Sequence, residues 1–148
     1  MWHRHRHALV VPVLAVLLLA ACSPASSPSA PKEQAVVVEK NAETGLSRLT
    51  LSAKAAERLG INTTPVADRQ DGGGRTVVPY SAVIYDASGK TWAYTNPDGL
   101  VFVRHSITVE RIDAQVAVLS GGPPIGTRVV TVGVAELWGI ETGVGGGH

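Results

Sequence analysis

Residues with catalytic side chains are few and scattered in this sequence. Beyond the first twenty residues the only histidines are His105 and His148, and the carboxylates Glu110 and Asp113 flank a predicted turn. No nucleophile–base–acid set, carboxylate pair or metal-ligand spacing is found, and the Gly72–Gly74 run lacks the Lys-Ser/Thr of a phosphate loop. We therefore predict that the protein is not an enzyme and that it holds no cofactor.

His105 is the one histidine placed where it could bind a ligand. It shares the register of Val101, Val103, Ile107 and Val109 in a predicted strand. An imidazole on such an apolar stripe could ligate a metal or sense pH. A partly buried, hydrogen-bonded histidine is the more common case, so we predict no metal site and keep His105 as a weaker candidate ligand.

Three aromatic residues are candidates for contact with a partner. Trp92 and Tyr94 share one face of a predicted strand, and Trp138 follows in a late turn. Aromatic residues at a period of two most often pack in a core. An exposed tryptophan here would instead be a leading partner contact, because tryptophan and tyrosine are favoured anchors at interfaces.

The single cysteine, Cys22, ends a segment built like a leader. A basic start at residues 1–7 precedes the apolar run 8–19, which is too short to span a membrane. Leu19, Ala20 and Ala21 lead into the cysteine, and this order resembles the lipobox of bacterial lipoproteins. The resemblance implies a cleaved signal peptide, 1–21, and an acylated Cys22 that anchors the protein on the extracytoplasmic face of the cell membrane.

Removal of such a leader changes the composition of the mature chain. Arg4 and Arg6 are lost with it, so the net charge changes from +1 to −1, and a nucleic acid is not an expected partner. Residues 22–34, rich in Ser, Pro and Ala, predict a disordered tether. We expect one folded domain over 35–144 and a flexible glycine-rich tail over 145–148.

The pattern over 35–144 predicts a mainly β domain. Ser52 is placed as the N-cap of a two-turn helix over 53–59 that Gly60 ends, and Pro65 favours an edge position for the strand that follows. Extended segments are expected at 36–38, 46–51 and 61–67, then at 76–78, 81–85, 91–95, 100–110, 115–119 and 127–132. Turns are expected at 86–89 and 96–99, with a turn or helical stub at 135–138. About six strands and one short helix describe a small β-roll or β-barrel.

Five short phrases follow one another along residues 46–144. They are Leu49-Thr50-Leu51-Ser52 with Leu59-Gly60-Ile61-Asn62-Thr63-Thr64-Pro65-Val66; Val78-Pro79-Tyr80-Ser81-Ala82-Val83; Trp92-Ala93-Tyr94; Phe102-Val103-Arg104 to Val109; and Val118-Leu119-Ser120-Gly121 to Gly133. Together they resemble the periplasmic adaptor subunits, or membrane fusion proteins, of efflux pumps.

The resemblance implies one adaptor domain only. Full adaptors carry a β-barrel, a lipoyl-like domain and a helical hairpin between the first phrase and the second, where this chain has about 68–75. What remains resembles the membrane-proximal β-roll, which in the family sits against the transporter. Without the hairpin, the chain is not expected to form a conduit across the envelope by itself.

Two functions follow as hypotheses. The first is a lipid-anchored, adaptor-like accessory subunit that docks on a membrane efflux transporter, with the lipid bilayer and the transporter as partners. The alternative is a small extracytoplasmic ligand- or metal-sensing lipoprotein that uses the same fold, with His105 as the candidate metal ligand.

Overall fold

The computed structural model of the 148-residue chain describes residues 34–69 and 75–144. The described residues all belong to one compact unit. The predicted signal peptide, the lipobox with Cys22, the tether up to residue 33 and the tail 145–148 therefore lie outside the described residues.

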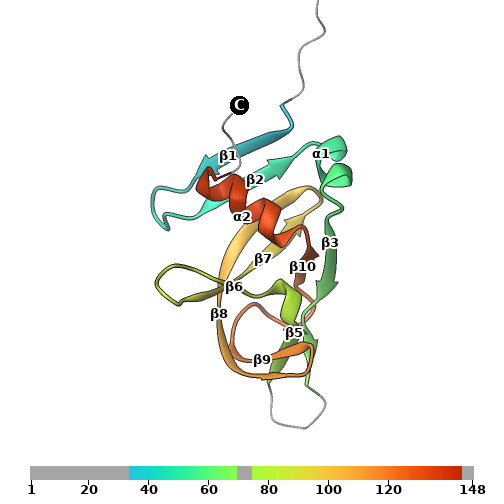
Figure 1. The fold of residues 1–148 in the computed structure, drawn as a ribbon, viewed down its shortest axis with the longest axis vertical. Helices are drawn as coiled ribbons and strands as arrows, with labels where there is room; N and C mark the ends of the chain where they lie inside the picture. The colour runs from blue at the N-terminus through green and yellow to red at the C-terminus, as the bar shows by residue number, and fades with distance from the viewer. Residues whose placement is uncertain (1–33, 70–74, 145–148) are drawn as a thin grey trace, which may run out of the picture. The chain divides into compact units, whose positions relative to one another are not determined.

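The described residues form the mainly β fold that the sequence predicts (Figure 1). Seven strands follow one another in a nearly closed, barrel-like sheet in the order β3-β10-β7-β8-β9-β5-β4, and β1, β2 and β6 pair beside this path. The strands are β1 (Val36–Lys40), β2 (Ser47–Leu51), β3 (Asn62–Pro65), β4 (Ala67–Asp68), β5 (Thr76–Pro79), β6 (Ile84–Tyr85), β7 (Thr91–Asp98), β8 (Val101–Asp113), β9 (Val116–Gly121) and β10 (Arg128–Val132). The helices are α1 (Ala53–Arg58) and α2 (Val134–Thr142), with a 3-10 turn at Tyr80–Ala82.

One stretch of chain brings the two ends of the sheet together. β3 and β4 are the two ends of the strand path, yet only Val66 separates them in sequence. The N–H of Val66 donates to the carbonyl of Thr127 (2.8 Å), and its carbonyl accepts from Gly126 (2.9 Å). β3 pairs with β10 alone, so Pro65 lies on an edge strand, as predicted, where its missing N–H costs no ladder hydrogen bond.

The long strand β8 joins two layers of the structure. Its first part pairs with β2 and β7, and its second part pairs with β9 after register shifts around Val109. Such bulges bend a strand. The sheet consequently has two buried faces, and residues that are neighbours in sequence belong to different cores.

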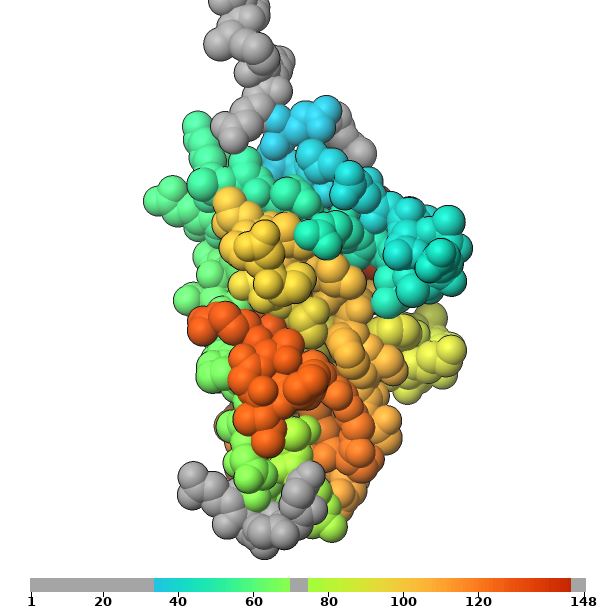
Figure 2. All heavy atoms as spheres, turned by 180° about the vertical axis from the view of Figure 1, so that it is seen from behind, coloured from blue at the N-terminus to red at the C-terminus, as the bar shows by residue number. Residues whose placement is uncertain are grey.

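The first core lies between the sheet and the two helices, and the second fills the barrel. On β7, Tyr94 belongs to the first and Ala93 to the second, and both are completely buried. The other buried members of the first core are Leu49, Leu51, Ala55, Ile84, Phe102, Val130 and Leu137. Figure 2, seen from behind, shows the β7–β8 turn (gold) beside the β1–β2 hairpin (cyan to teal), where Leu51 N–H donates to Leu100 C=O over 3.0 Å.

Helix α1 forms as predicted. The Oγ of Ser52 accepts a hydrogen bond from the Ala55 N–H (3.2 Å), which satisfies one of the first free amides of the helix. Gly60 follows with φ +61°, the left-handed conformation that ends a helix without strain only at glycine.

Helix α2 is longer than the predicted stub at 135–138. Its nine residues, Val134–Thr142, lie between two glycine caps, Gly133 with φ +87° and no side-chain cap, and Gly143. A Cβ at position 133 would overlap the Cδ1 of Ile61, so this entry into the helix also requires glycine for space. Leu137 is completely buried in the first core and packs the helix against the sheet. Figure 1 shows α2 (red) lying over the sheet near β2 and β7.

Two further expectations are wrong in detail. Ser81 and Ala82 belong to the 3-10 turn rather than to a strand, because Ala82 packs into the barrel core and Val83 N–H bonds back to Tyr80 C=O (3.0 Å). β7 continues as far as Asp98, with a bulge between Thr95 and Asp98, so the turn itself is only Gly99 and Leu100. Among the described residues, no helix is long and apolar enough to cross a membrane.

Candidate functional site

The three aromatic residues singled out from the sequence meet around one charged side chain that the sequence did not single out. Trp92 and Tyr94 come from β7, Arg104 comes from the paired strand β8, and Trp138 and Glu141 come from α2. We call these five residues the arginine clamp. Tyr94 is directly opposite Arg104 in the β7–β8 register, so the sheet itself brings these two together.

The guanidinium of Arg104 lies between two indole rings. Its carbon is 4.6 Å from the ring centroid of Trp92 and 4.8 Å from that of Trp138. A cation over an aromatic face is attracted by the ring quadrupole, and the attraction grows when water is excluded. The Arg104 side chain is 14% exposed, so both contacts act in a largely desolvated place.

Glu141 completes the clamp from α2. Its Oε2 lies 2.8 Å from Arg104 Nε and accepts a hydrogen bond from the Tyr94 hydroxyl (2.5 Å), and its side chain is 4% exposed. The Nε–H of Arg104 is not aligned on that oxygen well enough to form a hydrogen bond, so the contact is an ion pair without one. The Tyr94 hydroxyl is therefore the clamp's only hydrogen bond to Glu141.

Burial is the main reason why the pKa of Tyr94 lies well above its usual value. The hydrogen bond to Glu141 and that residue's negative charge raise the pKa further, and the charge of Arg104 opposes them. Tyr94 thus stays protonated and remains a donor throughout the neutral range.

Trp92 is held from its other side by the β6–β7 turn. Its Nε1–H donates to Oδ2 of Asp86 over 2.9 Å. The pKa of Asp86 lies well below its usual value because its carboxylate accepts from Ser88 first, and then from Trp92 and Lys90. Both ends of the indole are fixed, and the ring is half-buried rather than free on the surface.

A groove of about 520 Å³ opens beside the clamp, and we call it the hairpin groove. It lies where the pairing of β2 with β8 ends at Val103 and that of β9 begins at Thr108, so neither strand pairs with β8 over 104–107. The groove is lined by Glu39, Lys40, Asn41, Thr44, Leu46, Ser47, Arg48, Val103, Arg104 and His105.

The charge of the hairpin groove is positive. Lys40 and Arg48 face a single carboxylate in the lining, Glu39, while the charge of the third cation, Arg104, is already paired with Glu141. Among the described residues, neither Lys40 nor Arg48 makes an ion pair, and the terminal nitrogens of Arg104 make no hydrogen bond. Guanidinium groups present paired donors to carboxylates, so the groove can bind an extended acidic segment.

His105 lines this groove but is exposed, not partly buried as its register suggested. Its Nδ1 is 2.8 Å from the Ser106 carbonyl. Within 34–69 and 75–144, no three His, Cys, Asp or Glu side chains group as a metal site would require.

The carboxylates expected in a loop belong to β8 instead. Glu110 pairs with Arg75 (2.8 Å) and with Arg111 (3.1 Å), and Asp113 pairs with Arg69 (3.2 Å). All of these pairs are partly exposed, so each contributes little to stability.

Tyr94 is placed inside the core, which leaves Trp92 and Trp138, both half-buried, as the aromatic residues nearer the surface. Sequence reasoning missed Arg104 and Glu141. Arg104 is two residues after Phe102 on β8, so the alternation of a strand places both side chains on the face that the helices cover. Nothing in the local sequence indicates that Glu141 reaches the same place.

Tyr94→Phe is expected to lower the free energy of unfolding by about 1–3 kcal/mol at pH 7, because buried Glu141 loses its hydrogen-bond donor. The pKa of Tyr94 is raised on folding, so the stability it contributes is complete below the unfolded tyrosine pKa near 10 and is lost as the pH rises above it. The difference in unfolding free energy between the wild type and Tyr94→Phe should therefore become smaller as the pH of the urea titrations is raised from 8 to 11.5.

Tyr80→Phe is the control at pH 7, because Tyr80 is 41% exposed and its loss should change the unfolding free energy little there; at alkaline pH its hydroxyl interacts with that of Tyr85, whose pKa is raised by desolvation and then by Tyr80. If the wild-type and Tyr94→Phe curves stay parallel up to pH 11.5, the buried hydroxyl has no role in the alkaline loss of stability.

No protein-family model, no curated protein and no solved structure matches this chain.

Proposed function

We propose that this chain is a lipid-anchored, extracytoplasmic adaptor-like protein that docks on a membrane efflux transporter. The observation that carries the proposal is the order of the five adaptor-like phrases. They fall in turn on β2–α1–β3, on β5 with its 3-10 turn, on β7, on β8 and on β9–β10, and these elements together build one domain.

The connection between β4 and β5 also supports the proposal. Full adaptors carry their additional domains at this point of the chain. Here Ala67 and Asp68 pair with Val77 and Thr76, and the N–H of Arg69 donates to the carbonyl of Arg75 (2.8 Å). The barrel therefore closes on itself with a hairpin in place of the insertion, as expected for an adaptor domain used alone.

The hairpin groove is the docking surface that we favour. It combines two cations that make no ion pair with a described residue, Lys40 and Arg48, with a stretch of β8 that has no strand partner on the β2 side. An extended acidic segment of the transporter fits both features, since its carboxylates can meet Lys40 and Arg48 while its backbone lies along β8.

Photo-crosslinking in native membranes tests this function. With p-benzoylphenylalanine in place of His105, we expect a crosslink to an integral membrane subunit of a transporter, identified by mass spectrometry. Lys40→Glu with Arg48→Glu should remove at least about nine-tenths of that product, because the reversed charges repel an acidic segment. Cys22→Ala, which removes the acyl acceptor, should also reduce it.

Lys90→Glu together with Arg111→Glu is the control, since both cations are exposed and lie outside the groove. The proposal fails if the crosslinked protein is not a transporter component, or if the control pair reduces the product as strongly as the Lys40/Arg48 pair.

A further inference from the structure

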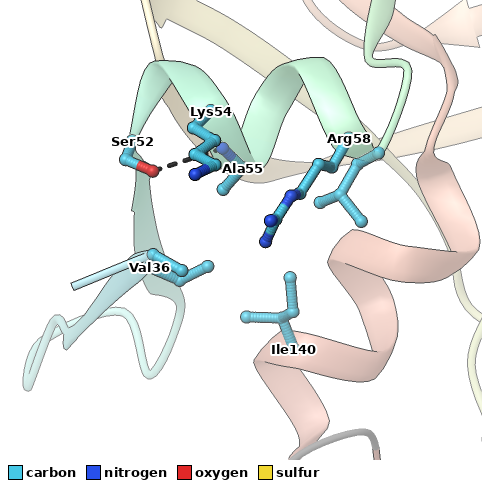
Figure 3. Close-up of a pocket in the computed structure, with 8 residues that line it drawn as sticks. Val36, Ser52, Lys54, Ala55, Arg58 and Ile140 are labelled. Carbon is cyan, nitrogen blue, oxygen red and sulfur yellow. Dashed lines mark hydrogen bonds between the residues drawn. The ribbon is translucent and has the colours of Figure 1, made fainter. Parts of the chain in front are cut away.

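A second groove lies between α1, α2 and the start of β1, and we call it the helix groove. Its volume is about 550 Å³, and it is lined by Ala35, Val36, Ser52, Lys54, Ala55, Arg58, Leu59 and Ile140. Figure 3 shows Arg58 reaching from α1 toward Ile140 of α2, with Val36 of β1 across the groove.

The helix groove is apolar on its floor and cationic at its rim. Val36, Leu59 and Ile140 are half-buried and pack against the first core. Lys54 and Arg58 are four residues apart on α1, so they project from the same side of the helix. The lining contains no acidic residue, and neither cation makes an ion pair with a described residue.

The position of the groove along the chain limits how far it can lie from Cys22. Ala35 and Val36 line it, so the chain enters the domain at the groove itself. Gln34 is twelve positions after Cys22. A fully extended chain of that length spans at most roughly 40 Å, whatever path it takes.

We propose that the helix groove binds the headgroup of an anionic phospholipid, with the phosphate at Lys54 and Arg58 and the first acyl carbons against the apolar floor. The inference rests on the proposed lipid anchor, which would keep the groove within reach of the bilayer surface. Charge and polarity both fit: guanidinium and ammonium groups bind phosphate, and Val36 and Ile140 offer the apolar contact that a free anion would not use.

Hydrogen exchange on the full acylated protein in nanodiscs tests the inference. We compare phosphatidylcholine alone with phosphatidylcholine and phosphatidylglycerol at three to one. With phosphatidylglycerol, the amides of α1 and of the first residues of β1 should exchange their hydrogens at about one third of the rate seen in phosphatidylcholine alone, or more slowly. Lys54→Gln with Arg58→Gln should abolish this difference.

Lys40→Gln with Arg48→Gln is the matched control, since it removes the same two residue types from the hairpin groove and should leave the protection intact. If both double variants lose the protection from hydrogen exchange equally, the inference is overturned, because the effect would then be a general attraction of positive charge to the membrane. Protection by a hexaglutamate peptide in phosphatidylcholine nanodiscs, with none from phosphatidylglycerol, would assign the groove to an acidic protein segment instead.

Failure of this inference can be told apart from failure of the proposed function. Loss of the phosphatidylglycerol effect with an intact crosslink from position 105 refutes the lipid site alone. A mature protein whose intact mass shows no acyl group on Cys22 refutes the anchor, and with it this inference.

Discussion

Replacing Arg104 by alanine is expected to lower the free energy of unfolding by about 3–5 kcal/mol, because it leaves a buried carboxylate without its countercharge. Glu141 is 4% exposed, and Tyr94 would remain its only partner in the clamp. The variant also removes the cation that lies between Trp92 and Trp138, so both indoles lose their stacking partner.

Urea unfolding followed by tryptophan fluorescence measures this effect. Arg111→Ala is the control, because Arg111 is 41% exposed and its pair with Glu110 should change stability by less than about 1 kcal/mol. Arg104→Met combined with Glu141→Leu and Tyr94→Phe should recover most of the loss, since apolar residues of similar size often replace a buried ion pair without cost, and Tyr94→Phe removes the hydroxyl that Glu141→Leu would leave without an acceptor. Equal destabilisation by Arg104→Ala and Arg111→Ala would contradict the clamp.

Leu137→Ala is expected to cost about 2–5 kcal/mol, the range for deleting a large aliphatic side chain from a packed core. Leu137 is completely buried and packs in the core that contains Leu49, Tyr94 and Phe102. Val134, Trp138 and Ile140 of α2 are only partly buried against this core, so the attachment of the helix to the sheet depends mainly on Leu137 and on the clamp.

Glu136→Ala, an exposed change on the same helix, separates core packing from helix propensity and should alter stability by less than about 0.5 kcal/mol. Both variants are compared by urea unfolding, with tryptophan fluorescence as a second readout. Loosening of α2 should make Trp138 more exposed and shift its emission to longer wavelength. If Leu137→Ala behaves like Glu136→Ala, α2 is not an integral part of the fold.

The two grooves lie at opposite ends of β1. Val36, at its start, lines the helix groove, and Glu39 and Lys40, at its end, line the hairpin groove. One short strand therefore connects the proposed lipid site with the proposed docking site. A domain held at the membrane through the first would present the second to a partner in the same membrane.

Elements set by local chemistry were predicted well from the sequence. Ser52 and Gly60 mark the start and end of α1 because a hydroxyl cap and a left-handed glycine act within one turn. Pro65 indicated an edge strand because proline has no N–H to donate. The period of two along β7 and β8 predicted strands, since alternate side chains face opposite sides of a sheet.

Elements that depend on distant contacts were not predicted at their true extent. α2 begins at a glycine without a side-chain cap and contains Gly139 and three β-branched residues, Val134, Ile140 and Thr142, so its local propensity is low. Its burial against β2 and β7 overrides that propensity. β7 likewise continues past Asn96 because the Asn96 side chain donates to the carbonyls of Gly99 and Val101, both at 2.8 Å.

The sequence by itself determined the mainly β class, the capped helix α1 and the single-cysteine leader pattern on which the predicted anchor depends. Only the tertiary structure decided that Tyr94 and Glu141, 47 positions apart, share a hydrogen bond, and that Arg104 lies between two tryptophans. The physical reason is one of range. Caps, turns and strand periods act over a few residues, whereas the clamp exists only because sheet register and helix packing bring three separate segments to one buried place.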